Sequence, residues 1–282
     1  MAFTTLISTD VLASRMGDPA FAIVDCRFKL DDPSWGEREW TASHIPGAVY
    51  AHLDRDLSSA KTGTNGRHPL PVARALAGTL SQFGISSGTQ VVAYDQGNGM
   101  FASRLWWLLR WLGHDAVAML DGGFAKWIAE GRATKSGEEH RGQATFTGSP
   151  RADMVVDVDG AVALAGRKDW RLLDARAPER FRGDVEPLDR VAGHIPGARN
   201  HFFQSNVDEH GLLRSPEALR AQFGATLGTV PAERVVCYCG SGVTACHNLL
   251  AMEHAGLKGA KLYAGSWSEW SADQKRPVET GG

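Results

Sequence analysis

Cysteine is scarce in this sequence, and its placement excludes two of its common uses. The chain of 282 residues has four cysteines, Cys26, Cys237, Cys239 and Cys246. Three of them crowd one segment, and their spacing is neither that of zinc ligands nor that of a disulfide framework. We therefore expect four free thiols, no bound metal ion and a reducing, cytoplasmic location.

Long apolar runs and an excess of one charge are also missing. The most apolar segment, 105–113, is too short to span a bilayer and contains Arg110. The first residues lack the basic and apolar regions of a signal peptide. With 30 Lys and Arg against 32 Asp and Glu, the formal charge is −2, so neither nucleic acid nor a membrane is an expected partner.

What the sequence does contain is an internal repeat. Four blocks of the first half recur in the same order in the second half, at offsets of 143 to 150 residues. The paired blocks are 23–27 and 172–176, 43–48 and 193–198, 91–95 and 235–239, and 120–127 and 263–270. We therefore expect two similar domains, residues 1–135 and 153–282, joined by a polar linker at 136–152.

Within each copy, short β-branched runs alternate with patterns of helical period, which predicts an α/β fold. The expected strands are 23–26, 49–50, 91–94, 116–120, 171–174, 199–200, 235–238 and 261–263, and the expected helices are 72–83, 101–112, 216–223 and 243–254. Such alternation favours a mostly parallel sheet flanked by helices in each domain. Functional residues are then expected beyond the carboxyl ends of the strands.

The clearest chemical signal is a cysteine at the end of a strand. The apolar run 235–238 ends at Cys239, and a loop of small residues, 240–244, leads into a helical pattern. Backbone N–H groups of such a loop, and the positive end of the helix that follows, favour the thiolate, which is the nucleophilic form. Cys239 is therefore the predicted nucleophile, whereas Cys237, inside the strand, is expected to be a packed core thiol.

Three kinds of chemistry would suit a cysteine in a glycine-rich loop: phosphate-ester cleavage, thiol redox chemistry and sulfur transfer. A phosphatase of this design needs a guanidinium six residues after the cysteine, where this chain has Ala245. A persulfide carries one negative sulfur, which converging N–H groups stabilise without a charged side chain. Sulfur transfer is therefore favoured. The first copy has Asp95 in place of the cysteine and is expected to be catalytically silent.

Taken together, these motifs resemble those of the two-domain rhodanese-like sulfurtransferases. The Asp-x-Arg strand ends, the His-Ile-Pro-Gly-Ala block of both halves and the loop 239–245 carry the resemblance over nearly the whole chain. It implies an inactive first domain and transfer of sulfane sulfur through a persulfide on Cys239, with no cofactor. The neutral Gly-Ser-Gly after the cysteine is similar to that of 3-mercaptopyruvate-type members, whereas thiosulfate-type members typically carry Arg-Lys.

The resemblance implies an enzyme that moves sulfur from 3-mercaptopyruvate to cyanide or to a thiol acceptor such as thioredoxin. A thiosulfate:cyanide sulfurtransferase that uses the same cysteine is the alternative, and a non-enzymatic persulfide-sensing or scaffold role is an alternative of another class. Ser241 is expected to assist catalysis beside Cys239. The expected substrate contacts of the loop are Gly240, Gly242, Val243 and Thr244.

Further site residues follow from the same resemblance. A donor with a carboxylate and a ketone needs a bidentate cation, and Arg180 matches one substrate arginine of the family. The second arginine would fall at Asp189, which leaves its neighbour Arg190 as the candidate. His68 resembles a histidine that some mechanisms link to the loop serine, and Asp54 is the nearest candidate for the associated acid. Ordinary surface polarity is the alternative for both.

The polar residues that occur in both copies are interpreted as structural, since one copy is expected to be silent. The histidines of the two His-Ile-Pro-Gly-Ala blocks are expected to bond to the backbone of their turns. The Asp-x-Arg motifs are expected to form ion pairs or to support loops. The residues concerned are His44, His194, Asp25, Arg27, Asp174 and Arg176.

Overall fold

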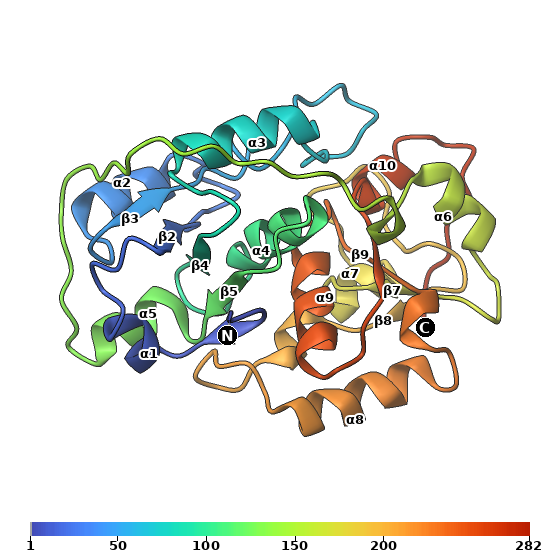
Figure 1. The fold of residues 1–282 in the computed structure, drawn as a ribbon. Coiled ribbons are helices and arrows are strands. Elements are labelled where there is room, and N and C mark those ends of the chain that lie inside the picture. The colour runs from blue at the N-terminus through green and yellow to red at the C-terminus, as the bar shows by residue number, and fades with distance from the viewer. Residues whose placement is uncertain (1) are drawn as a thin grey trace. The chain divides into compact units, whose positions relative to one another are not determined.

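The computed structural model describes residues 2–282, which form two compact units (Figure 1). The first unit consists of the chain up to Ser59 together with Pro71–Arg151 and Glu209–Leu213, and the second of Ala60–Leu70, Ala152–Asp208 and Arg214–Gly282. Most of the expected linker 136–152 thus belongs to the first unit. The segment Ala60–Leu70 comes from the first half of the chain and belongs to the second unit, an exchange that no composition pattern indicated.

The first unit contains a five-stranded sheet with the order β1-β5-β4-β2-β3, in which every pair of neighbours is parallel. Its strands are β1 (Leu6–Ile7), β2 (Phe21–Asp25), β3 (Ala48–Tyr50), β4 (Gln90–Tyr94) and β5 (Val117–Leu120). Its helices are α1 (Thr9–Ala13), α2 (Trp35–Ala42), α3 (Ala73–Gln82), α4 (Ala102–Trp111) and α5 (Gly123–Ala129). Helices joining parallel strands flank the sheet, as expected.

The second unit repeats this topology, with a parallel sheet in the order β6-β10-β9-β7-β8. Its strands are β6 (Val155–Val156), β7 (Arg171–Asp174), β8 (Arg199–Asn200), β9 (Val235–Tyr238) and β10 (Lys261–Tyr263). Its α-helices are α6 (Val158–Leu164), α7 (Pro178–Arg182), α8 (Pro216–Leu227), α9 (Thr244–His254) and α10 (Ser266–Trp270), and its 3₁₀ turns are η1 (Ala152–Met154), η2 (Phe203–Asn206) and η3 (Ala232–Arg234). The predicted α/β fold with two similar domains is confirmed.

The predicted elements exist, with boundaries that differ by at most four residues. The largest difference is α8, which continues to Leu227 because Leu227 is buried in line with Leu219 and Phe223. The strands β1 and β6 were not predicted. Each has two residues, which is too short for an alternation of apolar and polar positions to appear.

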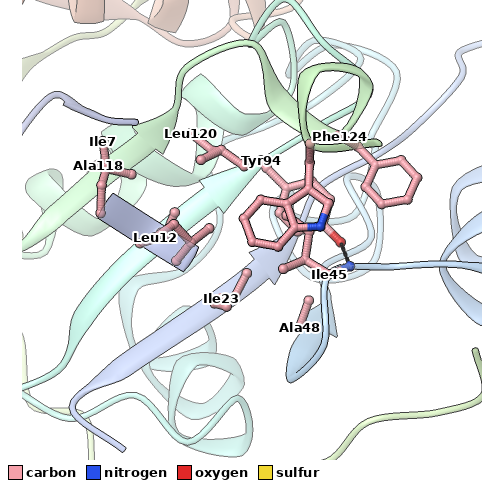
Figure 2. Close-up of a cluster of buried hydrophobic side chains, with 11 residues drawn as sticks. Ile7, Leu12, Ile23, Ile45, Ala48, Tyr94, Ala118, Leu120 and Phe124 are labelled. Carbon is pink, nitrogen blue, oxygen red and sulfur yellow. Dashed lines mark hydrogen bonds between the residues drawn. The ribbon is translucent and has the colours of Figure 1, made fainter. Parts of the chain in front are cut away.

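The cores of the two units repeat residue by residue. Figure 2 shows the first, in which the Ile45 N–H donates to the Tyr94 hydroxyl at 3.3 Å; the Ile195 N–H makes the same bond to Tyr238 at 3.3 Å. Both isoleucines lie in a His-Ile-Pro-Gly-Ala turn. The buried side chains of the second core include Leu172, Ile195, Ala198, Val236, Tyr238, Trp267 and Trp270. Each core therefore ties this turn to the central strand that ends at the cysteine or aspartate loop.

The histidines of these turns are structural, as predicted. Both imidazoles are buried, and Nδ1 of His44 lies 2.6 Å from the Trp40 carbonyl oxygen. Nδ1 of His194 lies 2.7 Å from the carbonyl oxygen of Phe181. Each histidine thus anchors its turn to the C-terminal part of the preceding helix, α2 or α7.

The two Asp-x-Arg motifs form buried ion pairs with the same geometry. Arg27 Nη2 lies 2.7 Å from Asp25, and Arg176 Nη2 lies 2.7 Å from Asp174. Burial raises the pKa of the Asp25 carboxyl above its usual range, although Arg27 opposes that effect. Each arginine also donates to a carbonyl just before its histidine turn, at Ser43 or Gly193. The expected ion pairs are confirmed.

None of the four cysteines forms a disulfide, and all four are buried. Burial raises the pKa values of the Cys237 and Cys26 thiols, which fits the core role predicted for Cys237. In residues 2–282 there is no cluster of three or more histidine, cysteine, aspartate or glutamate side chains that could hold a metal ion. Over the same residues, no helix has the length and apolar character needed to cross a membrane.

Candidate active site

Cys239 follows β9 directly, at the carboxyl end of the sheet. In the sheet, β9 lies next to β7. The chain continues from β7 to β8 at one edge of this pair and from β9 to β10 at the other. In open parallel sheets a crevice forms where neighbouring connections diverge in this way, and ligands bind there. The fold therefore places Cys239 at the position where a ligand site is expected.

The loop after the cysteine encloses its sulfur in backbone N–H groups. Sγ of Cys239 accepts hydrogen bonds from the Gly242 N–H at 3.1 Å and from the Ser241 N–H at 3.4 Å, and the residue is 2% exposed. Gly242 has a φ of +78°, and a β-carbon there would collide with the Ala264 carbonyl. The chain can therefore turn its amides toward the sulfur only with glycine at this position.

A serine that the sequence did not single out, Ser266, accepts a hydrogen bond from the backbone of Cys239. The Cys239 N–H donates to Ser266 Oγ at 3.1 Å, and that hydroxyl donates to the Tyr263 carbonyl at 3.0 Å. Ser266 has a φ of +55°, and no other non-glycine residue within 2–282 has a positive φ. The matching residue of the first unit is Gly123, also at +55°. The serine thus adopts a backbone conformation that costs about 1 kcal/mol or more, in exchange for the bond to Cys239.

The first unit shows what the same loop does without a thiol. The Asp95 carboxylate accepts four backbone hydrogen bonds, from Gly97 and Gly99 at 3.0 Å, Phe101 at 2.8 Å and Ala102 at 3.2 Å. Its amides are thus occupied by an internal anion, and a carboxylate cannot carry sulfur. This geometry supports the expectation that the first copy is silent. It also shows that a loop of this shape is a backbone anion site.

Ser241 has a histidine partner from a distant part of the chain. Its Oγ lies 2.7 Å from Nδ1 of His68, and both side chains are buried. His68 lies in the segment 60–70, which belongs to the second unit, and this explains how residues so far apart in sequence meet. Asp54 belongs to the first unit, and its part in a relay through His68 stays a prediction.

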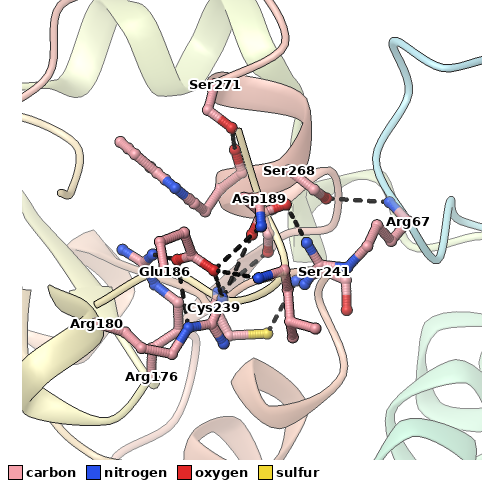
Figure 3. Close-up of polar contacts among 12 residues, drawn as sticks. Arg67, Arg176, Arg180, Glu186, Asp189, Cys239, Ser241, Ser268 and Ser271 are labelled. Atoms are coloured by element: carbon pink, nitrogen blue, oxygen red, sulfur yellow. Dashed lines mark hydrogen bonds and ion pairs between the residues drawn. The ribbon is translucent and has the colours of Figure 1, made fainter. Parts of the chain in front are cut away.

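A chain of alternating charges runs from β7 toward the cysteine loop (Figure 3). Arg176, paired with Asp174, also contacts Glu186 at 3.1 Å, and Glu186 contacts Arg180 at 2.6 Å. Burial alone would raise the pKa of Glu186, but hydrogen bonds from Arg180 and from the Leu188 N–H, with the charge of both arginines, hold it below its usual range. Glu186 is therefore an ionised anchor for Arg180.

Asp189 continues this chain to a second arginine of the site. Its carboxylate lies 3.4 Å from Arg180 Nη2 and forms a close ion pair with Arg67. Burial raises the pKa of Asp189 above its usual range, with a contribution from Glu186, against the opposing effect of the two arginines. The backbone of Arg67 is held as well, because its backbone N–H donates to Ser268 Oγ at 3.0 Å.

Both guanidiniums lie over the loop beside Cys239. A β-carbon on Gly240 would come 2.6 Å from Arg67 Nη2 and 3.6 Å from Arg180 Nη2, so a larger residue at this position would displace the Arg67 guanidinium. Arg180 is thus brought to the cysteine loop, as predicted. Arg190 is exposed, and among residues 2–282 no hydrogen bond or ion pair joins it to this loop. Sequence reasoning missed Arg67, whose only signal was its position next to His68.

The family to which this architecture belongs is shown by comparison with known proteins. The rhodanese-like domain family matches residues 8–130 and 157–273, which is most of both halves. This chain belongs to the rhodanese-like family. The rhodanese-like repeat thus coincides with the duplicated sheet, and only the second copy carries the cysteine.

Relatives of this rhodanese-like protein cover its full length. It is 49% identical over 283 residues, 100% of both chains, to the probable 3-mercaptopyruvate sulfurtransferase of Pseudomonas aeruginosa. It is 39% identical over 285 residues, 98% of this chain and 97% of the other, to the putative thiosulfate sulfurtransferase SseB of Mycobacterium tuberculosis. The crystal structure of SseA from Escherichia coli, a 3-mercaptopyruvate sulfotransferase with the rhodanese fold, aligns with a TM-score of 0.82 and 31% identity over 94% of this chain and 99% of that one.

Proposed function

We propose that this protein is a 3-mercaptopyruvate sulfurtransferase that carries sulfane sulfur as a persulfide on Cys239. The observation that carries the proposal is the neutral loop, in which backbone N–H groups of Ser241 and Gly242 meet the sulfur without a charged side chain of the loop. The name of the Pseudomonas relative supports the choice of donor. The M. tuberculosis relative bears the name of the alternative, a thiosulfate sulfurtransferase.

In the first half-reaction the Cys239 thiolate attacks the thiol sulfur of the donor. An S–S bond forms while the donor C–S bond breaks, and the electron pair of that bond stays on carbon as the enolate of pyruvate. The enolate takes up a proton and leaves as pyruvate, and the persulfide ionises. Atoms and charge balance without an oxidant or a reductant, which fits a site for which no cofactor is proposed.

Ser241 and His68 supply the polar assistance to this step. With Oγ and Nδ1 at 2.7 Å, the pair can pass a proton toward the ketone oxygen of the donor as negative charge develops there. Arg180 is proposed to bind the donor carboxylate, held in place by Glu186 at 2.6 Å. Arg190, which is exposed, stays a predicted second contact to the donor.

The loop backbone is proposed to bind the outer sulfur of the persulfide. The N–H groups concerned belong to Gly240, Gly242, Val243 and Thr244, and the four amides that hold the Asp95 carboxylate in the first unit support this role. In the second half-reaction a thiol of an acceptor such as thioredoxin, or cyanide, attacks that sulfur and the Cys239 thiolate leaves. Four cysteines that form no disulfide support a proposed cytoplasmic location.

The test is a donor panel with both acceptors. Purified protein is assayed with 3-mercaptopyruvate and with thiosulfate, using cyanide and reduced thioredoxin, and kcat/KM is compared. We expect 3-mercaptopyruvate to be the better donor, and the protein treated with donor alone to gain the mass of one sulfur atom. Cys239→Ser should lose both signals, whereas Cys26→Ala should keep both. A higher kcat/KM for thiosulfate, or transfer by Cys239→Ser, would refute the proposal.

A further inference from the structure

Asp189 reverses the charge at the position where the family resemblance places a second substrate arginine. Its carboxylate bridges two guanidiniums from distant segments, with 3.4 Å to Arg180 Nη2 and a close ion pair to Arg67 Nη1 (Figure 3). The Arg67 side chain is 27% exposed and that of Arg180 17%, but that of Asp189 only 5%. The two cations thus face outward and the carboxylate lies behind them.

The bonds to Asp189 determine which N–H groups remain for a ligand. Arg67 uses Nη1 for Asp189, and its Nη2 lies nearest the Gly240 position. Arg180 uses Nε and Nη2 for Glu186 and Asp189, and its Nη1 would lie 3.7 Å from a β-carbon on Gly240. Within residues 2–282 no hydrogen bond or ion pair uses Arg67 Nη2 or Arg180 Nη1, and both nitrogens lie beside the nucleophile loop. Asp189 therefore sets the orientation of both arginines.

The charges of this network cancel. Three arginines and three carboxylates are joined by its ion pairs, namely Arg67, Arg176, Arg180, Asp174, Glu186 and Asp189. The loop itself adds no charged side chain. Thiosulfate brings two negative charges to this partly buried place, whereas the carboxylate of a neutral-thiol 2-oxo acid brings one. A site with no net charge penalises the dianion more, because charges interact strongly where water is partly excluded.

We propose that Asp189 is a positioning residue that determines donor selectivity. It holds Arg67 and Arg180 over the Cys239 loop and cancels one of their two charges, so that a singly charged mercapto-2-oxo acid is accepted and the thiosulfate dianion is disfavoured. The proposal rests on the proposed function, since it takes sulfur transfer at Cys239 as the reaction. It makes selectivity a property of an ion pair outside the loop that follows the cysteine.

The experiment compares Asp189→Asn with wild type, using both donors and cyanide as acceptor. The asparagine keeps the shape and removes the charge. We expect the ratio of kcat/KM for thiosulfate to that for 3-mercaptopyruvate to rise about tenfold or more, mainly through a lower KM for thiosulfate. Asp184→Asn is the matched control, because Asp184 lies in the same segment, is exposed and pairs with Arg182. It should leave the ratio unchanged.

Two further variants distinguish an effect of charge from a loss of structure. Arg67→Gln should shift the ratio toward 3-mercaptopyruvate while lowering activity with both donors. The double variant Arg67→Gln/Asp189→Asn, again without net charge, should return the ratio close to that of wild type. A simple loss of folding in Asp189→Asn would not produce this order, and circular dichroism checks each variant.

The outcomes separate the two proposals. If wild type fails to use 3-mercaptopyruvate, the proposed function falls. If wild type prefers 3-mercaptopyruvate and folded Asp189→Asn keeps that preference unchanged, or if Asp184→Asn changes it equally, the role of Asp189 alone is overturned.

Discussion

At the scale of single residues, the site consists of short-range pairs that bring distant positions together. One of these pairs is Ser241 with His68, at 2.7 Å and with both side chains buried. A buried hydroxyl–imidazole pair of this kind can deliver a proton without help from bulk water. If the pair protonates the developing enolate, the loss of kcat on removing it must depend on the leaving group of the donor.

His68→Gln and Ser241→Ala test this dependence. We expect each to lower kcat with 3-mercaptopyruvate by about ten- to a hundredfold, and to lower it much less with thiosulfate, because sulfite leaves as a stable anion. The double variant should lose little more than either single one, since the two residues act as a unit. Steady-state kinetics with both donors measure this. Equal losses with the two donors would contradict a role in protonating the enolate.

Asp189 also has a consequence for stability. Because its pKa is raised in the folded protein, the folded state binds that proton more tightly than the unfolded chain, whose value is near 3.8. The ionised carboxylate therefore costs stability at neutral pH, and the cost vanishes as the pH falls through the raised pKa. Asp189→Asn should melt at or above the wild-type temperature at pH 7, with a gap that narrows toward pH 4. Thermal unfolding at several pH values tests the sign, and a gap that widens in acid would contradict it.

At the scale of elements, contiguous motifs were predictable and long-range pairings were not. The strand–loop–helix around Cys239 is one unbroken segment, so its residues and their roles follow from local pattern. Arg67 meets Asp189 across 122 residues, and one sequence contains no signal for such an ion pair. The segment 60–70 joins the second unit through contacts of this kind, and so composition could not locate it.

The unusual backbone of Ser266 could have been inferred from the matching residue of the repeat. The matching Gly123 has the same positive φ, and a glycine at a repeated position indicates an unusual backbone conformation. A serine there reads as an ordinary N-terminal helix residue, since its hydroxyl suits helix starts. Only the structure shows that its Oγ bonds the Cys239 N–H instead.

Substitutions at Ser266 should separate backbone strain from function. Ser266→Gly relieves the positive φ and removes the bond to Cys239, so its melting temperature should stay close to wild type while persulfide formation slows several-fold. Ser266→Ala keeps the strain and loses the bond, and should cost about 1–3 kcal/mol of folding free energy.

The rate is measured by single-turnover transfer from donor to Cys239. Gly123→Ala is the control in the first unit, where a β-carbon would lie 2.7 Å from the Asp95 carbonyl oxygen. It should destabilise without slowing that rate. An unchanged rate in Ser266→Gly would show that the serine does not support the nucleophile.

At the scale of the whole molecule, duplication supplies an internal control for the active copy. The pairs Asp25–Arg27 and Asp174–Arg176 have the same ion-pair distance of 2.7 Å and the same strand position, and their arginines donate to the matching carbonyls of Ser43 and Gly193. In the second unit Arg176 also contacts Glu186 and through it Arg180, whereas over residues 2–282 Arg27 forms no ion pair with a second carboxylate. A structural motif of the common fold thus supports Arg180, the proposed donor contact.

Matched substitutions in the two copies should therefore share one effect and differ in another. Asp25→Asn and Asp174→Asn each leave without its carboxylate an arginine that is only 3% exposed, whereas the arginines beside Asp189 reach solvent. Each of the two substitutions should therefore cost about 3–5 kcal/mol of folding free energy in urea unfolding. Only Asp174→Asn should also raise KM for 3-mercaptopyruvate. Without Asp174, Arg176 pairs more closely with Glu186, and the bond between Glu186 and Arg180 weakens. Both are assayed at low temperature, where the folded protein persists. Equal KM changes in the two variants would show that the network does not extend from the fold to the donor.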